Sequence, residues 1–216
     1  MERNVKALII SSHPDDEVLG CGGTIRKLTN EGFDVYVLIL TSKIEKYLKE
    51  CCLNAHKVLG TKKIFFENFP NQLLDSVPII KINNVIENYL SKLKPSIVFT
   101  HHFGDVNMDH KVVFNATSVA VRPLYPLIVK KLYSYFVASS TEWNVNTENV
   151  FIPNTFINIE DSLDKKIKAM KCYKTEYRKH PHPRSAESIK SYAHYWGGMA
   201  GFKFAEPFVL LREIIL

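Results

Sequence analysis

Two clusters of polar residues hold the side chains with which this sequence could do chemistry. The first contains His13, Asp15 and Asp16, which follow an apolar run and precede a stretch with helical spacing. Aspartate is almost never buried without a partner, so an imidazole and two carboxylates in one short turn are costly to explain by core packing, whereas a shared cation would satisfy them. The competing interpretation is structural: Asp15 or Asp16 caps the helix that follows, and His13 is half exposed.

The second cluster follows another apolar run and contains His101, His102, Asp105, Asn107, Asp109 and His110. In an open parallel sheet ligands bind at the carboxyl ends of the strands, so two neighbouring strand ends could bring His13, Asp16 and His110 to one metal. Two imidazoles and one carboxylate with an open position are the ligand set of catalytic zinc, whereas a structural zinc site has four protein ligands, usually with Cys. Hydrolysis by metal-bound water is therefore the predicted chemistry. His101 and His102 close a strand, and we expect them to support the site at most.

The elements that must position these clusters follow from the hydropathy pattern. Apolar runs rich in β-branched and aromatic residues alternate with stretches of helical spacing, which indicates β-α-β units and a mostly parallel sheet covered on both faces. The predicted strands are 7–11, 35–40, 63–66, 97–100 and 132–137. The predicted helices begin after Val18, occupy 44–59 and 79–93, and begin again near Asn107, while 139–158 is expected to be a loop or small added strands. The expected fold class is α/β, a Rossmann-like three-layer α/β/α sandwich with a mostly parallel sheet.

Composition narrows the class of protein. A chain of 216 residues with 46% hydrophobic and 23% charged residues suits one globular domain over 1–216. Its apolar runs fall short of the roughly 20 residues that a membrane span needs, and its charged start is unlike a secretory signal, so we expect a cytoplasmic protein without a membrane span. The four cysteines form no CxxC pair and predict no disulfide framework. The net charge of +6 is spread along the chain without a nucleic-acid-binding motif, so no nucleic-acid partner is predicted.

Three motifs carry a resemblance to a known family. Ser12–Glu17 reads Ser-His-Pro-Asp-Asp-Glu and is followed by Gly20-Cys21-Gly22-Gly23-Thr24, and Asp105–His110 reads Asp-Val-Asn-Met-Asp-His. A third stretch contains His182-Pro183-Arg184-Ser185 and continues to Phe208. In type, order and spacing these motifs resemble the PIG-L (LmbE-like) zinc-dependent N-deacetylases, and the resemblance spans nearly the whole chain.

The resemblance implies a role for each member of the first two clusters. His13, Asp16 and His110 would be zinc ligands, and Asp15 would be the general base. Zinc lowers the pKa of its bound water toward about 7 and polarises the amide carbonyl, so a carboxylate can take the proton as hydroxide attacks. Zn2+ is the cofactor that the family implies, although this ligand set also accepts iron, cobalt or manganese.

The remaining expected site residues have alternative explanations. Asn107 stands where many members carry an oxyanion-stabilising histidine, and since an amide cannot become charged, either Asn107 donates a neutral hydrogen bond or His182 supplies the cation. The resemblance and residue chemistry make Asp75, Arg184 and Trp196 candidate substrate-binding residues. Each has a structural alternative: Asp75 as a turn residue, Arg184 as a capping or surface residue, and Trp196 as a packing residue that otherwise stacks on a sugar face.

The leading hypothesis is a metal-dependent hydrolase that removes an N-acetyl group from a small amino sugar of the N-acetylglucosamine type, nucleotide-linked or glycosidic. Deacylation of another N-acyl small molecule, such as a formyl sugar, a thiol precursor or a chito-oligosaccharide, is the first alternative. A non-catalytic metal-binding protein has no need of the extra carboxylate of Asp15. A Rossmann-like nucleotide-binding module would carry GxGxxG at the turn that holds His-Pro-Asp-Asp here. The family includes trimers and hexamers, which leaves a homo-oligomer open.

Overall fold

The computed structural model describes residues 5–41, 46–124 and 129–215. Within these ranges the strands form a 7-stranded sheet in the order β3-β2-β1-β4-β5-β7-β6. Strands β1 to β5 are parallel, and β7 runs antiparallel to both of its neighbours. The strand bounds are β1 Lys6–Ser11, β2 Asp34–Ile39, β3 Lys63–Phe66, β4 Ile97–His101, β5 Lys131–Tyr135, β6 Thr155–Asn158 and β7 Ala205–Glu213.

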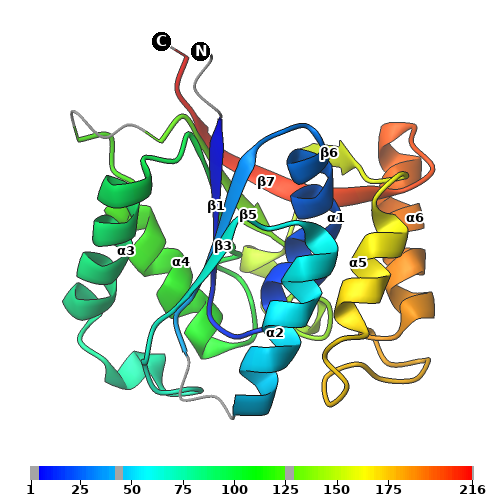
Figure 1. The fold of residues 1–216 in the computed structure, drawn as a ribbon, viewed down its shortest axis with the longest axis horizontal. Helices are drawn as coiled ribbons and strands as arrows, with labels where there is room; N and C mark the ends of the chain where they lie inside the picture. The colour runs from blue at the N-terminus through cyan, green and yellow to red at the C-terminus, as the bar shows by residue number, and fades with distance from the viewer. Residues whose placement is uncertain (1–4, 42–45, 125–128, 216) are drawn as a thin grey trace.

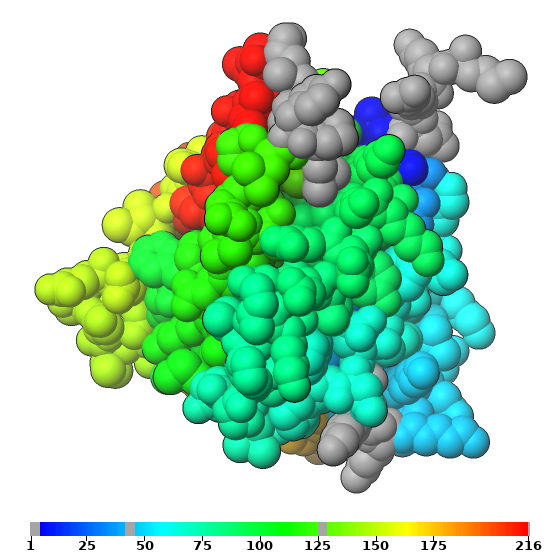
Figure 2. All heavy atoms as spheres, turned by 90° about the vertical axis from the view of Figure 1, so that its left-hand side faces the viewer, coloured from blue at the N-terminus to red at the C-terminus, as the bar shows by residue number. Residues whose placement is uncertain are grey.

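Helices cover both faces of this sheet (Figure 1). Helices α3 and α4 lie on one face, which is turned toward the viewer in Figure 2, and α1, α2, α5 and α6 lie on the other. The helix bounds are α1 Asp16–Asn30, α2 Lys46–Leu59, α3 Ile79–Leu93, α4 Met108–Ala120, α5 Leu163–Met170 and α6 Ala186–Ala200. None of the described helices is long and apolar enough to cross a membrane. The three-layer α/β sandwich that the sequence predicts is thus confirmed.

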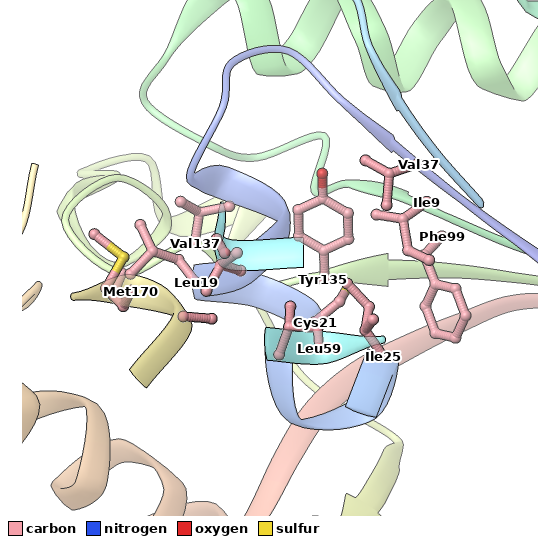
Figure 3. Close-up of a cluster of buried hydrophobic side chains, with 14 of the residues drawn as sticks. Ile9, Leu19, Cys21, Ile25, Val37, Leu59, Phe99, Tyr135, Val137 and Met170 are labelled. Atoms are coloured by element: carbon pink, nitrogen blue, oxygen red, sulfur yellow. The ribbon is translucent and has the colours of Figure 1, made fainter. Parts of the chain in front are cut away.

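Each face of the sheet has its own hydrophobic core because side chains alternate along a strand. In β1, Ala7 and Ile9 point into the cluster under α1, whereas Leu8 and Ile10 point into the cluster under α3 and α4. Figure 3 shows Ile9 in the first cluster, near Phe99 and Tyr135 from β4 and β5. The continuous apolar runs of the sequence are explained by this burial on both faces.

The C-terminal part of the sheet differs most from the sequence-based expectation. The five parallel strands lie where the apolar runs predict them, and β6 is a small strand within the segment left open as loop or strand. Strand β7 was not predicted, since buried Glu206 and Pro207 interrupt its apolar pattern. The second half of the strand, from residue 209 on, is only partly buried or exposed. The predicted start of the second helix at 44 lies outside the described residues, and α2 is described from Lys46.

Close contact between α1 and the sheet requires a residue without a side chain at Gly20. A Cβ atom there would lie 2.4 Å from Cδ2 of Tyr135, whose hydroxyl donates a hydrogen bond to the main-chain oxygen of Ile10. The buried ring of Tyr135 therefore lies between β1 and α1 and has little room to move. This contact sets how closely the second turn of α1 approaches the sheet.

We expect Gly20→Ala to destabilise the protein by about 1–3 kcal/mol, because it overpacks the contact with Tyr135. Urea unfolding followed by circular dichroism measures this change. The matched control is Gly198→Ala on α6, where a Cβ would meet nothing within 4 Å. Alanine should be neutral or stabilising there by up to about 1 kcal/mol, since it is the better helix former. Equal effects of the two substitutions would contradict the contact argument.

Candidate metal and catalytic site

The two polar clusters meet because β1 and β4 are parallel neighbours in the centre of the sheet. The turn after β1 carries His13, Asp15 and Asp16, and the segment after β4 leads into α4 with His110 on its first turn. One donor atom from each of His13, Asp16 and His110 lies within 4.8 Å of the others. Side chains from separate parts of the chain therefore converge on one point at the carboxyl edge of the sheet.

The carboxylate of Asp16 is the centre of this group. Its Oδ2 lies 3.1 Å from Nδ1 of His13 and 3.1 Å from Nε2 of His110. The Nε2 atom of His110 is buried and has no well-directed hydrogen bond within the described residues. Two imidazole nitrogens crowded on one carboxylate oxygen, one of them without a directed partner, fit the donor set of a divalent transition metal held by two histidines and one aspartate.

Two further carboxylates orient the histidines. Asp109 Oδ2 lies 2.9 Å from Nε2 of His13, and its carboxylate also accepts hydrogen bonds from the main-chain N–H groups of Gln72 and Leu74. Because a carboxylate only accepts, each ring nitrogen of His13 donates to its own carboxylate, Nε2 to Asp109 and Nδ1 to Asp16. The bond to Asp109 fixes Nε2 as the N–H, so Nδ1 is the nitrogen that could give up its proton to bind a metal.

Asp105 lies beside the other imidazole, although Nδ1 of His110, like its Nε2, has no well-directed hydrogen bond in the part of the chain that the structure describes. One of its oxygens lies 3.1 Å from Nδ1 of His110, and the carboxylate accepts hydrogen bonds from the hydroxyls of Ser140 and Thr141. Neither Asp105 nor Asp109 was among the predicted site residues. Their place beside His110 in the second motif was the available signal, because metal-bound histidines commonly pair with a carboxylate.

The pKa shifts reflect this concentration of carboxylates. Burial alone would lower the pKa of His13, but Asp109 and Asp16 raise it to about 9. Burial is likewise outweighed at His110, whose pKa rises to about 10 beside Asp16 and Asp105. Burial would raise the pKa of Asp16, but the two imidazoles hold it well below its usual range. The site thus favours positive charge at the point where the donor atoms meet.

His101 lies against this group but is not available as a ligand. Its Nε2 accepts a hydrogen bond of 2.9 Å from the main-chain N–H of Ser12, and its ring stacks on His110 with centroids 3.8 Å apart. Burial, with His110 nearby, holds the pKa of His101 well below its usual range. A neutral imidazole in this position separates the site from the core, as expected for a residue that only supports it.

Asp15 has an unusual backbone conformation. It is the N-cap residue of α1, with a φ of 105° and no capping hydrogen bond from its side chain. For a residue other than glycine such a conformation costs of the order of 1–3 kcal/mol. Its carboxylate instead reaches Arg184, with Oδ2 2.8 Å from Nη1. Burial raises the pKa of Asp15 well above its usual range, which Arg184 opposes and Asp16 and Glu17 reinforce.

A cavity of about 560 Å3 joins these groups. Its lining includes His13, Asp15, Asp16, Asn107, His110, Glu176 and Arg184, together with Leu48, Asn71, Gln72, Val106, Met108 and Trp143. The guanidinium of Arg184 bridges Asp15 and Glu176, with Nη1 2.7 Å from the Glu176 carboxylate. Arg184 therefore lies in the cavity, next to the expected base.

The two candidates for oxyanion stabilisation are placed differently. Asn107 caps α4: its Oδ1 accepts a hydrogen bond of 2.9 Å from the main-chain N–H of Asp109, which leaves its amide NH2 as a donor in the cavity. His182 does not line the cavity, and its ring lies 6.2 Å from that of Trp143. Burial, with Arg184 and Arg178 nearby, lowers the pKa of His182, so positive charge there is disfavoured.

Asp75 and Trp196 also lie outside the cavity. Asp75 is exposed on the short 3-10 helix η1 (Leu74–Ser76), while its neighbours Asn71 and Gln72 line the cavity instead. Trp196 on α6 lines a separate aromatic pocket of about 550 Å3 and packs near Phe136 and Phe151. The structure brings neither residue next to Asp15.

The model of the PIG-L family, described as GlcNAc-PI de-N-acetylase, matches residues 8–121, which include both polar clusters. The chain is 26% identical over 229 aligned residues to the diacetylchitobiose deacetylase of Thermococcus kodakarensis, covering 98% of this chain and 85% of that protein. That relative is therefore similar across the whole fold, including the segment with Arg184.

Solved structures show how widely the fold occurs. The conserved protein TT1542 from Thermus thermophilus aligns with a TM-score of 0.80 and 24% identity, covering 98% of this chain and 97% of that one. The 4-carboxy-2-hydroxymuconate hydratase GalB of Pseudomonas putida KT2440 aligns with a TM-score of 0.76 and 18% identity, covering 98% of each chain. One fold thus supports different reactions, and the sequence match decides the family. Because the family model spans more than half of the chain, including both polar clusters, the chain belongs to the PIG-L family of de-N-acetylases.

Proposed function

We propose that this chain is a metal-dependent N-deacetylase that removes an acetyl group from a small amino sugar of the N-acetylglucosamine type, nucleotide-linked or glycosidic. The observation that carries the proposal is that one cavity is lined both by the three residues of the donor set, His13, Asp16 and His110, and by the separate carboxylate of Asp15. Asp15 bonds to Arg184 and lies outside the donor set. A site that only binds metal has no need of it.

His13, Asp16 and His110 would hold the metal, with Zn2+ as the proposed ion. A divalent metal at this position supplies a Lewis acid that polarises the amide carbonyl and a lowered pKa for water. Asp15 takes the proton from the attacking water and passes it to the leaving amine. Its raised pKa supports this role, because a general base works best when its pKa approaches the working pH.

Arg184 and Asn107 complete the proposed machinery. The hydrogen bond from Arg184 fixes the direction of the Asp15 carboxylate, and Arg184 faces the cavity as a cation. The free amide NH2 of Asn107 is the proposed donor to the oxyanion. His182 is the less favoured donor, because it does not line the cavity and positive charge on it is disfavoured.

We expect Asp15→Asn to lower kcat by about 10²–10⁴-fold, the range for loss of a general acid–base group, while metal binding persists. Acetate release by the zinc-loaded protein is measured on free, glycosidic and nucleotide-linked N-acetyl amino sugars. Formyl sugars and N-acetyl thiol precursors, included in the same panel, test the alternative acyl substrates. Full activity of the Asp15→Asn variant would remove Asp15 from the mechanism, and a metal-loaded wild type without turnover on any compound would favour a non-catalytic protein.

We expect Asp109→Asn to weaken zinc affinity by about 10–100-fold, because the amide removes the charge that fixes the His13 tautomer. Competition with a chromophoric chelator measures the affinity. Asp75→Asn is the matched control, since Asp75 is a nearby exposed aspartate outside the cavity. Equal affinities of the two variants would show that Asp109 does not support the metal site.

A further inference from the structure

Glu17 is a fully buried carboxylate directly behind the catalytic turn. It lies on the first turn of α1 and accepts three hydrogen bonds. Its Oε2 accepts from the main-chain N–H of Asp15 at 3.0 Å, and its Oε1 accepts from the hydroxyl of Tyr173 at 2.8 Å and pairs with Nε2 of His56 at 3.0 Å. Glu17 does not line the cavity, and its hydrogen bond to a residue that does is the one with the main-chain N–H of Asp15.

The partners of Glu17 come from separate elements and are themselves fixed. His56 lies on α2 and is buried, and its Nδ1 lies 2.7 Å from the hydroxyl of Thr61. Because Glu17 only accepts, Nε2 of His56 carries the proton and Nδ1 accepts from Thr61. Tyr173 follows α5 and is fully buried, and burial raises the pKa of its hydroxyl, which keeps it a donor.

A second metal site is a poor explanation for this group. Glu17, Cys52 and His56 do offer donor atoms within 4.8 Å of one another. However, Glu17 and both nitrogens of His56 already have hydrogen-bond partners, and burial raises the pKa of the Cys52 thiol, which keeps it protonated. A metal there would have to break these hydrogen bonds. The group is therefore a satisfied hydrogen-bond network.

This network binds the main chain of Asp15 through the hydrogen bond from its N–H to Glu17. An aspartate at an N-cap ordinarily has a β-region backbone, and its side chain caps a main-chain N–H of the first helical turn. Here the positive φ turns the carboxylate away from the helix and toward Arg184. The main-chain N–H of Asp15 is buried as well and needs an acceptor, which Glu17 supplies.

We propose that Glu17, held by Tyr173 and His56, is a positioning residue that keeps Asp15 in its left-handed conformation and so directs the Asp15 carboxylate into the cavity. The inference rests on the proposed role of Asp15 as the base. Without the Glu17 acceptor, the Asp15 side chain can return to the ordinary capping position, where it no longer reaches the attacking water.

The test is Glu17→Gln in the zinc-loaded enzyme, assayed for acetate release on the best substrate of the panel. A glutamine presents its NH2 group either to the N–H of Asp15 or to the two donors Tyr173 and His56, so at least one hydrogen bond of the network is lost or must reverse its direction. We expect kcat to fall by about 10²-fold, the cost of a catalytic group displaced by about 1 Å, with KM and zinc affinity unchanged. An unchanged kcat in a folded Glu17→Gln protein would overturn the proposal.

Glu206→Gln is the matched control. Glu206 is also a buried glutamate that binds main-chain N–H groups of α1, at Gly23 and Thr24, and it pairs with Lys166 away from Asp15. We expect this variant to lower the melting temperature and leave the kcat of the folded enzyme unchanged. An equal fall in kcat for both variants would mean that Glu17 acts only through general stability, which would overturn the proposal.

A double variant separates this inference from the proposed function. If Glu17 acts through Asp15, then Glu17→Gln should have no further effect on the residual activity of Asp15→Asn, whereas multiplied losses would overturn the positioning role. Full activity of Asp15→Asn alone would instead refute the base role itself. If Glu17→Gln does not fold, Tyr173→Phe removes one of the three hydrogen bonds; a reduced kcat supports the proposal and a full kcat overturns it.

Discussion

A single oxygen of Asp16 lies 3.1 Å from two imidazoles, one from each of the first two motifs. The other contacts of the site depend on this arrangement. The carboxylate is buried and could not keep its charge without cations or donors close by. Its pKa is held low by the same imidazoles whose pKa values it raises. Each group is stable in its charged form only because the others are present.

The supporting contacts come from segments that the sheet order places around its carboxyl edge. Asp109 is fixed by main-chain N–H groups of Gln72 and Leu74, and Asp105 by the hydroxyls of Ser140 and Thr141. These segments follow β3 and β5, on either side of the central strands. The connections beyond the strands are thus part of the site, and the parallel strands fix where those connections start.

The parts of the fold that have a local signal in the sequence could be predicted from it. Continuous apolar runs marked β1 to β5, and the helix over Ile79–Leu93 ended as expected before Pro95. The convergence of His13, Asp16 and His110 was predictable because the first two are close together in the chain and the third completes a second motif. The pairing of Asp15 with Arg184 spans 169 positions and the bond of Glu17 to Tyr173 spans 156, so neither leaves a pattern of spacing. Strand β7 was missed for a related reason: the partners that allow Glu206 to be buried in it, Lys166 and the main-chain N–H groups of Gly23 and Thr24, are all far away in the chain.

The antiparallel direction of β7 also determines at which end of the sheet this last strand finishes. Through the register of β1, β4, β5 and β7, Lys6 at the start of β1 and Glu213 at the end of β7 come to the same end of the sheet, opposite the carboxyl ends of the parallel strands where the cavity lies. Figure 1 shows the start of β1 and the end of β7 together at the top of the view. An affinity tag, a carrier protein or a solid support attached beside either residue would leave the entrance of the cavity open to solution. Linking the two positions by a short peptide, as in a circular permutation, would likewise run behind the catalytic edge.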